Sequence, residues 1–186
     1  SLCLGTFDLS VYEMVGAYST FVNKGVWTEP VFVTKIEDKN GIIIEEFTPK
    51  TQEAMSEETA AIMVRLLQGV VDGVYSPEAK TSKGTGVRLR YKYNFTNEIG
   101  GKTGTTQNQS DGWFIGITPN LVTGVWSGCE DRSVHFRDIY YGQGANMALP
   151  VFAEYLTRVY EDKDVSKIIP IKFNIPKYID VKMDCG

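Results

Sequence analysis

The sequence predicts an α+β fold in which an antiparallel β-sheet is flanked by helices. Helical patterns come first along the chain, and another helical pattern closes it. Between them, three predicted strands gather near residues 98–127, and a tight turn separates the last two, as in antiparallel strands. Strands that gather in one part of a chain, with helices on either side, favour α+β over an alternating β-α arrangement.

The first predicted helix lies within "DLSVYEMVGAYSTFVNKG", residues 8–25. Ser10 and Glu13 form the S-x-x-E pattern of a capping box, and apolar residues recur after it at helical spacing. Gly25 is a candidate stop signal. The next stretch, "VFVTKIEDKNGIIIEEF" (31–47), is typical of a β-hairpin. Its Asn40-Gly41 pair would supply the positive φ angles that a tight turn needs.

A second helix is expected from the cap at Ser56 to about Asp72. It is apolar nearly all round, which predicts a central position. Residues 73–96 are rich in Gly, Lys, Arg and Tyr. They predict a loop that contains one short helix near 87–92.

Three strands are expected at 98–103, 113–118 and 121–127, with Pro119-Asn120 as the turn between the last two. A final amphipathic helix is expected at 148–160. From Val165 onward, prolines interrupt a Lys/Ile-rich stretch, which predicts an extended tail. The expected organisation is therefore one folded unit at 1–164 and a tail at 165–186.

Composition excludes several classes of function. The 186 residues carry a net charge of −4, which argues against a nucleic-acid partner. The cysteines at 3, 129 and 185 are widely spaced, which indicates neither a zinc site nor a disulfide framework. No apolar run reaches the ~18 residues of a membrane span. The chain opens directly in "SLCLG", so we expect a piece of a longer polypeptide.

The cluster "GGKTGTT" (100–106) has three interpretations. A phosphate loop would need glycine at Thr96 and a helix after the cluster, and neither condition is met. A solvated strand end is the unremarkable alternative. The third is a strand that recognises a carboxylate, since Thr103 and Thr105 share one face and Lys102 lies beside them. Gly104 would let another backbone approach closely, so a peptide could lie alongside as an added strand.

The wider context resembles a known family. "GGKTGTTQNQSDGWFIGITPNLVTGVW" is similar to the Lys-Thr-Gly strand and the two following strands in the transpeptidase domain of class A penicillin-binding proteins. "SLCLGTFDLSVYEMVGAYSTFVNKG", "LLQGVVDGVYSPEAKTSKGTG" and "GQGANMALPVFAEYL" resemble other segments of the same domain, in the same order. The resemblance covers roughly residues 1–160 and implies part of the penicillin-binding-protein/serine β-lactamase-like fold.

This resemblance implies an enzyme that cross-links peptidoglycan through a serine acyl-enzyme, at the outer face of the bacterial inner membrane. Lys102 would orient the substrate carboxylate and support proton transfer, and the Thr105 N–H would be an oxyanion-hole donor. Thr103, Gly104, Thr105 and Thr106 would contact substrate. The partners would be a D-Ala-D-Ala stem peptide and β-lactams, with membrane contact only through an upstream anchor. No cofactor or metal is implied.

The family's two other motifs, Ser-x-x-Lys and Ser-x-Asn, occur nowhere in the sequence. We therefore expect this chain to be inactive alone and its truncated sheet to favour self-association. Two alternatives stay open at this point. One is a D,D-carboxypeptidase or serine β-lactamase of the same superfamily. The other is a non-catalytic module that binds a peptide or a protein partner.

Overall fold

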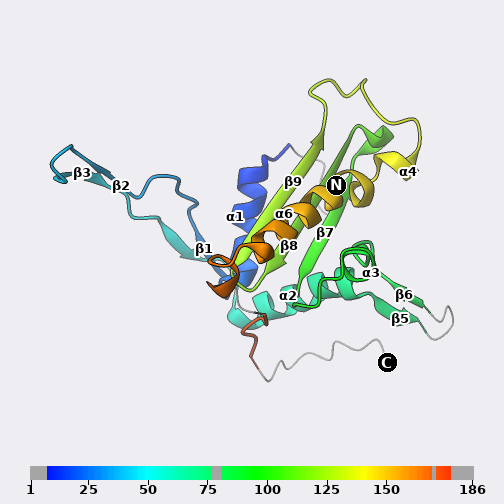
Figure 1. Cartoon of the computed structure of the whole chain (residues 1–186), viewed down its shortest axis with the longest axis horizontal. Helices are drawn as coiled ribbons and strands as arrows, with labels where there is room; N and C mark the ends of the chain where they lie inside the picture. The colour runs from blue at the N-terminus through cyan, green and yellow to red at the C-terminus, as the bar shows by residue number, and fades with distance from the viewer. Residues whose placement is uncertain (1–7, 77–80, 169–170, 177–186) are drawn as a thin grey trace.

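The computed structural model describes residues 8–76, 81–168 and 171–176. Its centre is a three-stranded antiparallel sheet of β7 (Gly100–Thr105), β8 (Asp111–Thr118) and β9 (Leu121–Gly128), in the order β7-β8-β9. Helices lie on both sides of this sheet (Figure 1). The expected α+β arrangement, an antiparallel sheet flanked by helices, is confirmed.

Alternation along β8 separates two apolar clusters. Ile117 packs with Val64 and Leu67 of α2 (Glu57–Asp72), and α1 (Val11–Val22) lies on this same side. Phe114 faces the other side, where its ring centroid is 4.9 Å from that of Phe152 in α6 (Leu149–Glu161). Residues an odd number apart on a strand point to opposite faces. The sheet therefore forms the middle layer between two helical layers.

The first helix begins where the capping box predicts. The Glu13 N–H donates to Ser10 Oγ (3.2 Å), and the Ser10 N–H donates to the Glu13 carboxylate (2.8 Å). The helix ends at Val22, and Gly25 follows with a φ of +88°. A Cβ at Gly25 would lie 2.1 Å from the Met55 carbonyl oxygen, so the stop glycine also permits a close backbone contact.

The expected hairpin forms from β2 (Lys35–Glu37) and β3 (Ile43–Glu46). A second antiparallel pair, β1 (Val26–Thr28) with β4 (Thr51–Glu53), joins it to the body. The expected turn geometry is wrong in one respect, because Gly41 has a positive φ (+81°) and Asn40 does not. The Asp38 carboxylate instead accepts the N–H groups of Asn40 and Ile42 and closes a longer loop.

The helix α2 begins after Ser56 and ends at Asp72, as expected. Its central position is confirmed for one side only, since Val64 and Val71 are buried and Leu66 is 56% exposed. After it come β5 (Val74–Ser76), β6 (Thr81–Lys83) and α3 (Arg88–Tyr91). The short helix was expected, whereas the β5–β6 pair was not, because its strands are only three residues long.

The strand expected at 98–103 lies two residues later, at Gly100–Thr105. Glu98 instead contacts the tail, where its N–H donates to the Ile171 carbonyl and its carboxylate accepts the Phe173 N–H. The last long helix is α6, close to the expected 148–160.

The sequence did not predict three short helices, of which one lies between β7 and β8 and two follow β9. They are η2 (Gln107–Gln109), α4 (Ile139–Gly142) and α5 (Gly144–Met147). Another short turn, η3 (Ser166–Ile168), begins the stretch that was expected to be extended. Within the described ranges, no helix combines the length and apolar character needed to cross a bilayer.

Candidate functional site

The strand β7 presents a free edge in the described part of the chain, since it pairs there only with β8. The Thr106 N–H donates to the Asp111 carbonyl oxygen (3.2 Å) at the end of this pair. Opposite residues in an antiparallel ladder alternate between hydrogen-bonded and non-hydrogen-bonded pairs. The register therefore turns the N–H and C=O groups of Thr103 and Thr105 away from β8, toward the free edge.

Lys102 reaches the same edge from the other face of the strand. It is opposite Ile115, whereas Thr103 is opposite Phe114, so the two side chains start on different faces. The exposed Lys102 ammonium donates to the Thr103 carbonyl oxygen at 2.8 Å. Since that carbonyl points outward, the ammonium lies at the edge where Thr103 and Thr105 present their backbone groups.

The hydroxyls of Thr103 and Thr105 are each held by a residue from another segment. Thr103 Oγ1 donates to Thr85 Oγ1 (2.9 Å), in the loop before α3. Thr105 Oγ1 accepts the N–H of Gly144, the first residue of α5, at 3.0 Å. A hydroxyl has one donor and two acceptor sites, so the Thr105 hydroxyl can still donate to a ligand.

Gly104 and Thr106 were expected to contact substrate, and both also stabilise the fold. A Cβ at Gly104 would lie 3.0 Å from the Cβ of Trp113 on β8. The Thr106 hydroxyl bonds Ser110 Oγ (2.9 Å) and accepts the Asp111 N–H (3.1 Å). These bonds close the β7–β8 connection and so commit the Thr106 hydroxyl within the fold.

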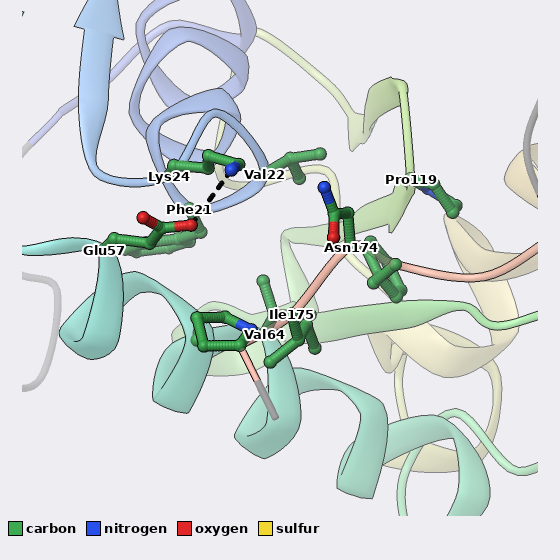
Figure 2. A pocket seen from close by; sticks show the side chains of 11 residues that line it. Phe21, Val22, Lys24, Glu57, Val64, Pro119, Asn174 and Ile175 are labelled. Atoms are coloured by element: carbon green, nitrogen blue, oxygen red, sulfur yellow. Dashed lines mark ion pairs between the residues drawn. The ribbon is translucent and has the colours of Figure 1, made fainter. Parts of the chain in front are cut away.

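The five expected residues line neither of two hollows on the described surface. One hollow, of about 60 Å³, lies between α1, α2 and the tail, next to the Lys24–Glu57 ion pair (3.0 Å), as Figure 2 shows. The other is a shallow hollow of about 360 Å³ between α3 and the aromatic residues Phe136, Tyr140 and Tyr141. The candidate site is therefore an open strand edge, which suits an extended ligand better than a compact one.

No cluster of three or more His, Cys, Asp or Glu side chains in the described residues could hold a metal ion. The site's chemistry rests on one ammonium, two hydroxyls and outward backbone groups. Such groups bind and polarise a carboxylate or a carbonyl oxygen. They include no side chain placed as a nucleophile beside a base.

A model of the penicillin binding protein transpeptidase domain matches residues 2–126, which is most of the chain. This chain belongs to the penicillin-binding protein transpeptidase family. The match includes α1, α2 and the complete Lys-Thr-Gly strand with its partner β8. The match therefore includes the strand that carries the candidate site, whereas Gly144 of α5 lies beyond it.

Relatives within the family are much longer than this chain. Penicillin-binding protein 1A of Aquifex aeolicus is 32% identical over 167 residues, covering 88% of this chain and 21% of that protein. Penicillin-binding protein 1A of Rickettsia conorii is 28% identical over 176 residues, covering 88% and 22%. The chain thus spans about a fifth of the length of these curated relatives.

Solved structures of the family share the fold. Penicillin-binding protein 1A from Haemophilus influenzae superposes with a TM-score of 0.74 at 27% identity, covering 87% of this chain and 28% of that one. A Mycobacterium penicillin-binding protein 3 complexed with ampicillin gives a TM-score of 0.63 at 18% identity, covering 92% and 39%, and this likeness shows the fold alone.

Thr85 and Gly144 are the site residues that sequence reasoning missed. They lie 18 and 39 positions from the threonines they contact. The stretch that contains Gly144, "GQGAN", carries no local pattern that marks it as a hydrogen-bond donor to a distant strand. Only the folded arrangement of α5 over the end of β7 and β8 brings it there.

Proposed function

We propose that the longer protein containing this chain is a peptidoglycan D,D-transpeptidase of the class A penicillin-binding protein type. It would work on the outer side of the bacterial inner membrane, with a glycosyltransferase domain upstream. A serine would attack the D-Ala-D-Ala bond of one stem peptide, and an amine of a second stem peptide would then take the acyl group. Residues 1–164 would form the C-terminal portion of the transpeptidase domain, followed by a tail at 165–186.

The observation that carries this proposal is the outward backbone of Thr105, with its hydroxyl fixed by Gly144. A peptide laid along β7 as an added strand would place its carboxylate beside the two threonine hydroxyls. The Thr105 N–H would donate to the oxyanion of the tetrahedral intermediate. The Lys102 ammonium would exchange its bond to the Thr103 carbonyl for one to the substrate or the serine.

Lys102 is the first residue to test in the longer protein. Removal of a charged hydrogen-bonding partner costs about 1.5–3 kcal/mol, which corresponds to a fall of roughly 10- to 150-fold in the acylation rate. We expect Lys102→Ala to show this fall in stopped-flow acylation by a chromogenic β-lactam. Lys163→Ala, at an exposed lysine after α6, is the matched control and should react normally. Acylation of the Lys102 variant within a few-fold of wild type contradicts the assigned role.

The nucleophile is proposed to lie outside these 186 residues. No serine here is followed by lysine at the third position or by asparagine at the second. Intact-mass spectrometry after incubation with a β-lactam should therefore show no adduct on the isolated chain and one adduct on the longer protein. A stoichiometric adduct on the isolated chain refutes this part of the proposal.

The reaction class is tested separately with a stem-peptide donor and an amine acceptor. The longer protein should form the cross-linked peptide and release D-alanine. Release of D-alanine without any cross-linked product, at saturating acceptor, would indicate a carboxypeptidase instead.

A further inference from the structure

A two-stranded arm projects from the body of the protein. The arm comprises residues 31–47 and contains β2 and β3, and β1 and β4 lead into and out of it (Figure 1). Every residue of the arm except Asp38 is exposed. Within the described residues, the helices that cover the central sheet therefore leave the arm largely exposed.

Eight of the arm's 17 residues are exposed large apolar side chains, and six others are charged. Phe32 is 89% exposed, Ile44 67% and Ile42 63%. The arm's other exposed large apolar side chains are Val31, Val33, Ile36, Ile43 and Phe47. Exposed large apolar side chains gathered on one projection of this kind are typical of an interaction site on a soluble protein.

Phe32, at the base of the arm, is held in place by a contact within the protein itself. Its ring stacks on Tyr12 of α1, with centroids 5.4 Å apart and planes inclined by 25°. The Tyr12 hydroxyl donates to the Pro30 carbonyl oxygen at 2.5 Å, which fixes the ring of Tyr12. A large aromatic side chain held in place and still exposed has the character of an interface anchor.

Apolar side chains occur on both faces of the hairpin. Ile36 and Phe47 share one face, since Ile36 pairs with Glu45 and the Phe47 N–H bonds the Thr34 carbonyl. Ile43 lies on the opposite face, across from Glu37. The register shifts between Ile36 and Glu37, which adds one residue to β3. A partner must therefore enclose the hairpin rather than cover a single side.

A hairpin of two strands is at best marginally stable in water, and it needs a third strand or a packed surface for support. The cross-strand pairs here offer little support of their own, since Lys35 bonds Glu37 on its own strand at 2.5 Å. Exposed ion pairs of this kind contribute little to stability. The arm is therefore expected to be covered whenever the protein is in its working state.

The composition of the arm favours a permanent cover over a transient partner. Permanent interfaces are more apolar than those of partners that come and go. The chain also spans only about a fifth of its relatives, so most of a protein of that kind would lie outside these residues. A permanent apolar cover is most simply supplied from within the same polypeptide.

We propose that the arm docks into an apolar groove formed by a segment of the same longer polypeptide outside residues 1–186, with Phe32 and Ile44 as its anchors. The proposal shares with the proposed function only the premise that the chain is part of a longer protein. It does not depend on the transpeptidase chemistry, and its test requires no activity.

Site-specific photo-crosslinking in cells that express the full-length protein tests this proposal. p-Benzoylphenylalanine is placed at Phe32, at Ile44 and, as a control, at the exposed polar residue Glu161 at the end of α6. We expect a product at the mass of one chain from the two arm positions. Peptide mapping should join the arm to a segment outside residues 1–186, and the control position should give little product.

Other outcomes overturn the proposal. A product at twice the chain mass would assign the arm to a second copy, and a product with a different protein would assign it to a separate partner. An equal yield of crosslinked product from Glu161 would show that the arm is no more closely covered than an ordinary exposed position.

Hydrogen exchange of the purified full-length protein gives an independent reading. Amides of Ile43–Glu46 should exchange at least about 100-fold more slowly than in an unstructured peptide, and Phe32→Ser with Ile44→Ser should remove this protection. Exchange at the unprotected rate in the wild-type protein overturns the proposal, whatever the crosslinking yield.

Discussion

Substitution of Gly144 by alanine tests how the end of β7 is held. Gly144 is the first residue of α5, and its N–H donates to Thr105 Oγ1. A Cβ there would lie 2.2 Å from the carbonyl oxygen of Gly104 and 2.5 Å from that of Trp113. Both atoms belong to the backbone of paired strands, so neither can move aside as a flexible side chain would.

The size of the effect follows from these contacts. Relief of the clash requires α5 to move away from the sheet by about 1 Å, and overpacking of this kind costs about 1–3 kcal/mol. The movement also weakens the bond from the Gly144 N–H to Thr105, which is worth about 1 kcal/mol. We therefore expect Gly144→Ala to lower the free energy of unfolding by about 2–4 kcal/mol.

Urea unfolding, followed by the fluorescence of Trp113 and the other tryptophans, measures this change. Gly69→Ala is the matched control, because a Cβ at this position in α2 would meet no atom within 4 Å. Alanine is favoured over glycine in a helix interior by about 1 kcal/mol, so the control should be more stable than wild type. The same substitution, glycine to alanine, is thus expected to lower the free energy of unfolding at position 144 and to raise it at position 69.

In the longer protein, Gly144→Ala should also slow acylation by a β-lactam about tenfold, which corresponds to about 1.4 kcal/mol. The added methyl group would not touch the ligand, and the loss would come from displacement of the Thr105 hydroxyl and N–H. An unfolding free energy and an acylation rate both equal to wild type would refute the reasoning about the α5 contact.

Three further predictions concern the helices and the segment before β7. Ser10→Ala should lower the free energy of unfolding by about 1 kcal/mol through loss of the N-cap. Hydrogen bonds from the Ser10 backbone and side chain lower the pKa of Glu13. The ionised Glu13 carboxylate therefore stabilises the folded state above the ordinary glutamate pKa, and this stabilisation is lost as pH falls through the lowered value. The bond from the Glu13 N–H to Ser10 Oγ does not depend on pH, whereas the bond from Ser10 Oγ to the Glu13 carboxylate does. The difference between the urea midpoints of variant and wild type should therefore narrow in acid without vanishing, and a constant difference would contradict this linkage. Burial raises the pKa values of Tyr18 and Tyr160 above 10, so the folded state favours their neutral forms. The resulting contribution to the free energy of unfolding is present below pH 10 and falls as pH rises through the raised pKa values. Phenylalanine at both positions should make the free energy of unfolding less dependent on pH in this range. An unchanged alkaline profile would exclude these tyrosines as the cause of the fall. Arg90→Ala removes charged hydrogen bonds to two backbone carbonyls ahead of β7, at 2.8 and 2.7 Å, and should cost about 2 kcal/mol. A change below about 0.5 kcal/mol in urea unfolding would show that these bonds are replaced by water.

The elements that could be predicted from sequence are those with local signals. Ser10 and Ser56 each supply a side-chain cap within one turn, so the starts of α1 and α2 are marked by residues next to them. The hairpin at β2–β3 was likewise predictable from the Asn40-Gly41 pair, of which Gly41 alone adopts the positive φ of the turn. These features do not depend on distant parts of the chain.

Elements set by distant contacts could not be predicted in the same way. The shift of β7 depends on Glu98 bonding Ile171, which is more than seventy residues away. The helix α5 has four residues and no periodic pattern, yet it holds Thr105. For the candidate site, strand alternation predicted the shared face of Thr103 and Thr105, whereas their partners depend on tertiary packing alone.

The contact between the tail and the early helices has a consequence for synthesis on the ribosome. Phe173 and Ile175 pack beside Val64 and Ile117, so a part of the core begun by α1 and α2 is completed by residues made more than a hundred positions later. Chains emerge at roughly 5–20 residues per second, so this apolar groove stays open for several seconds after α2 appears. During that interval the nascent chain offers a binding site for a chaperone, and translation that stops before residue 171 would release the protein with the groove unfilled.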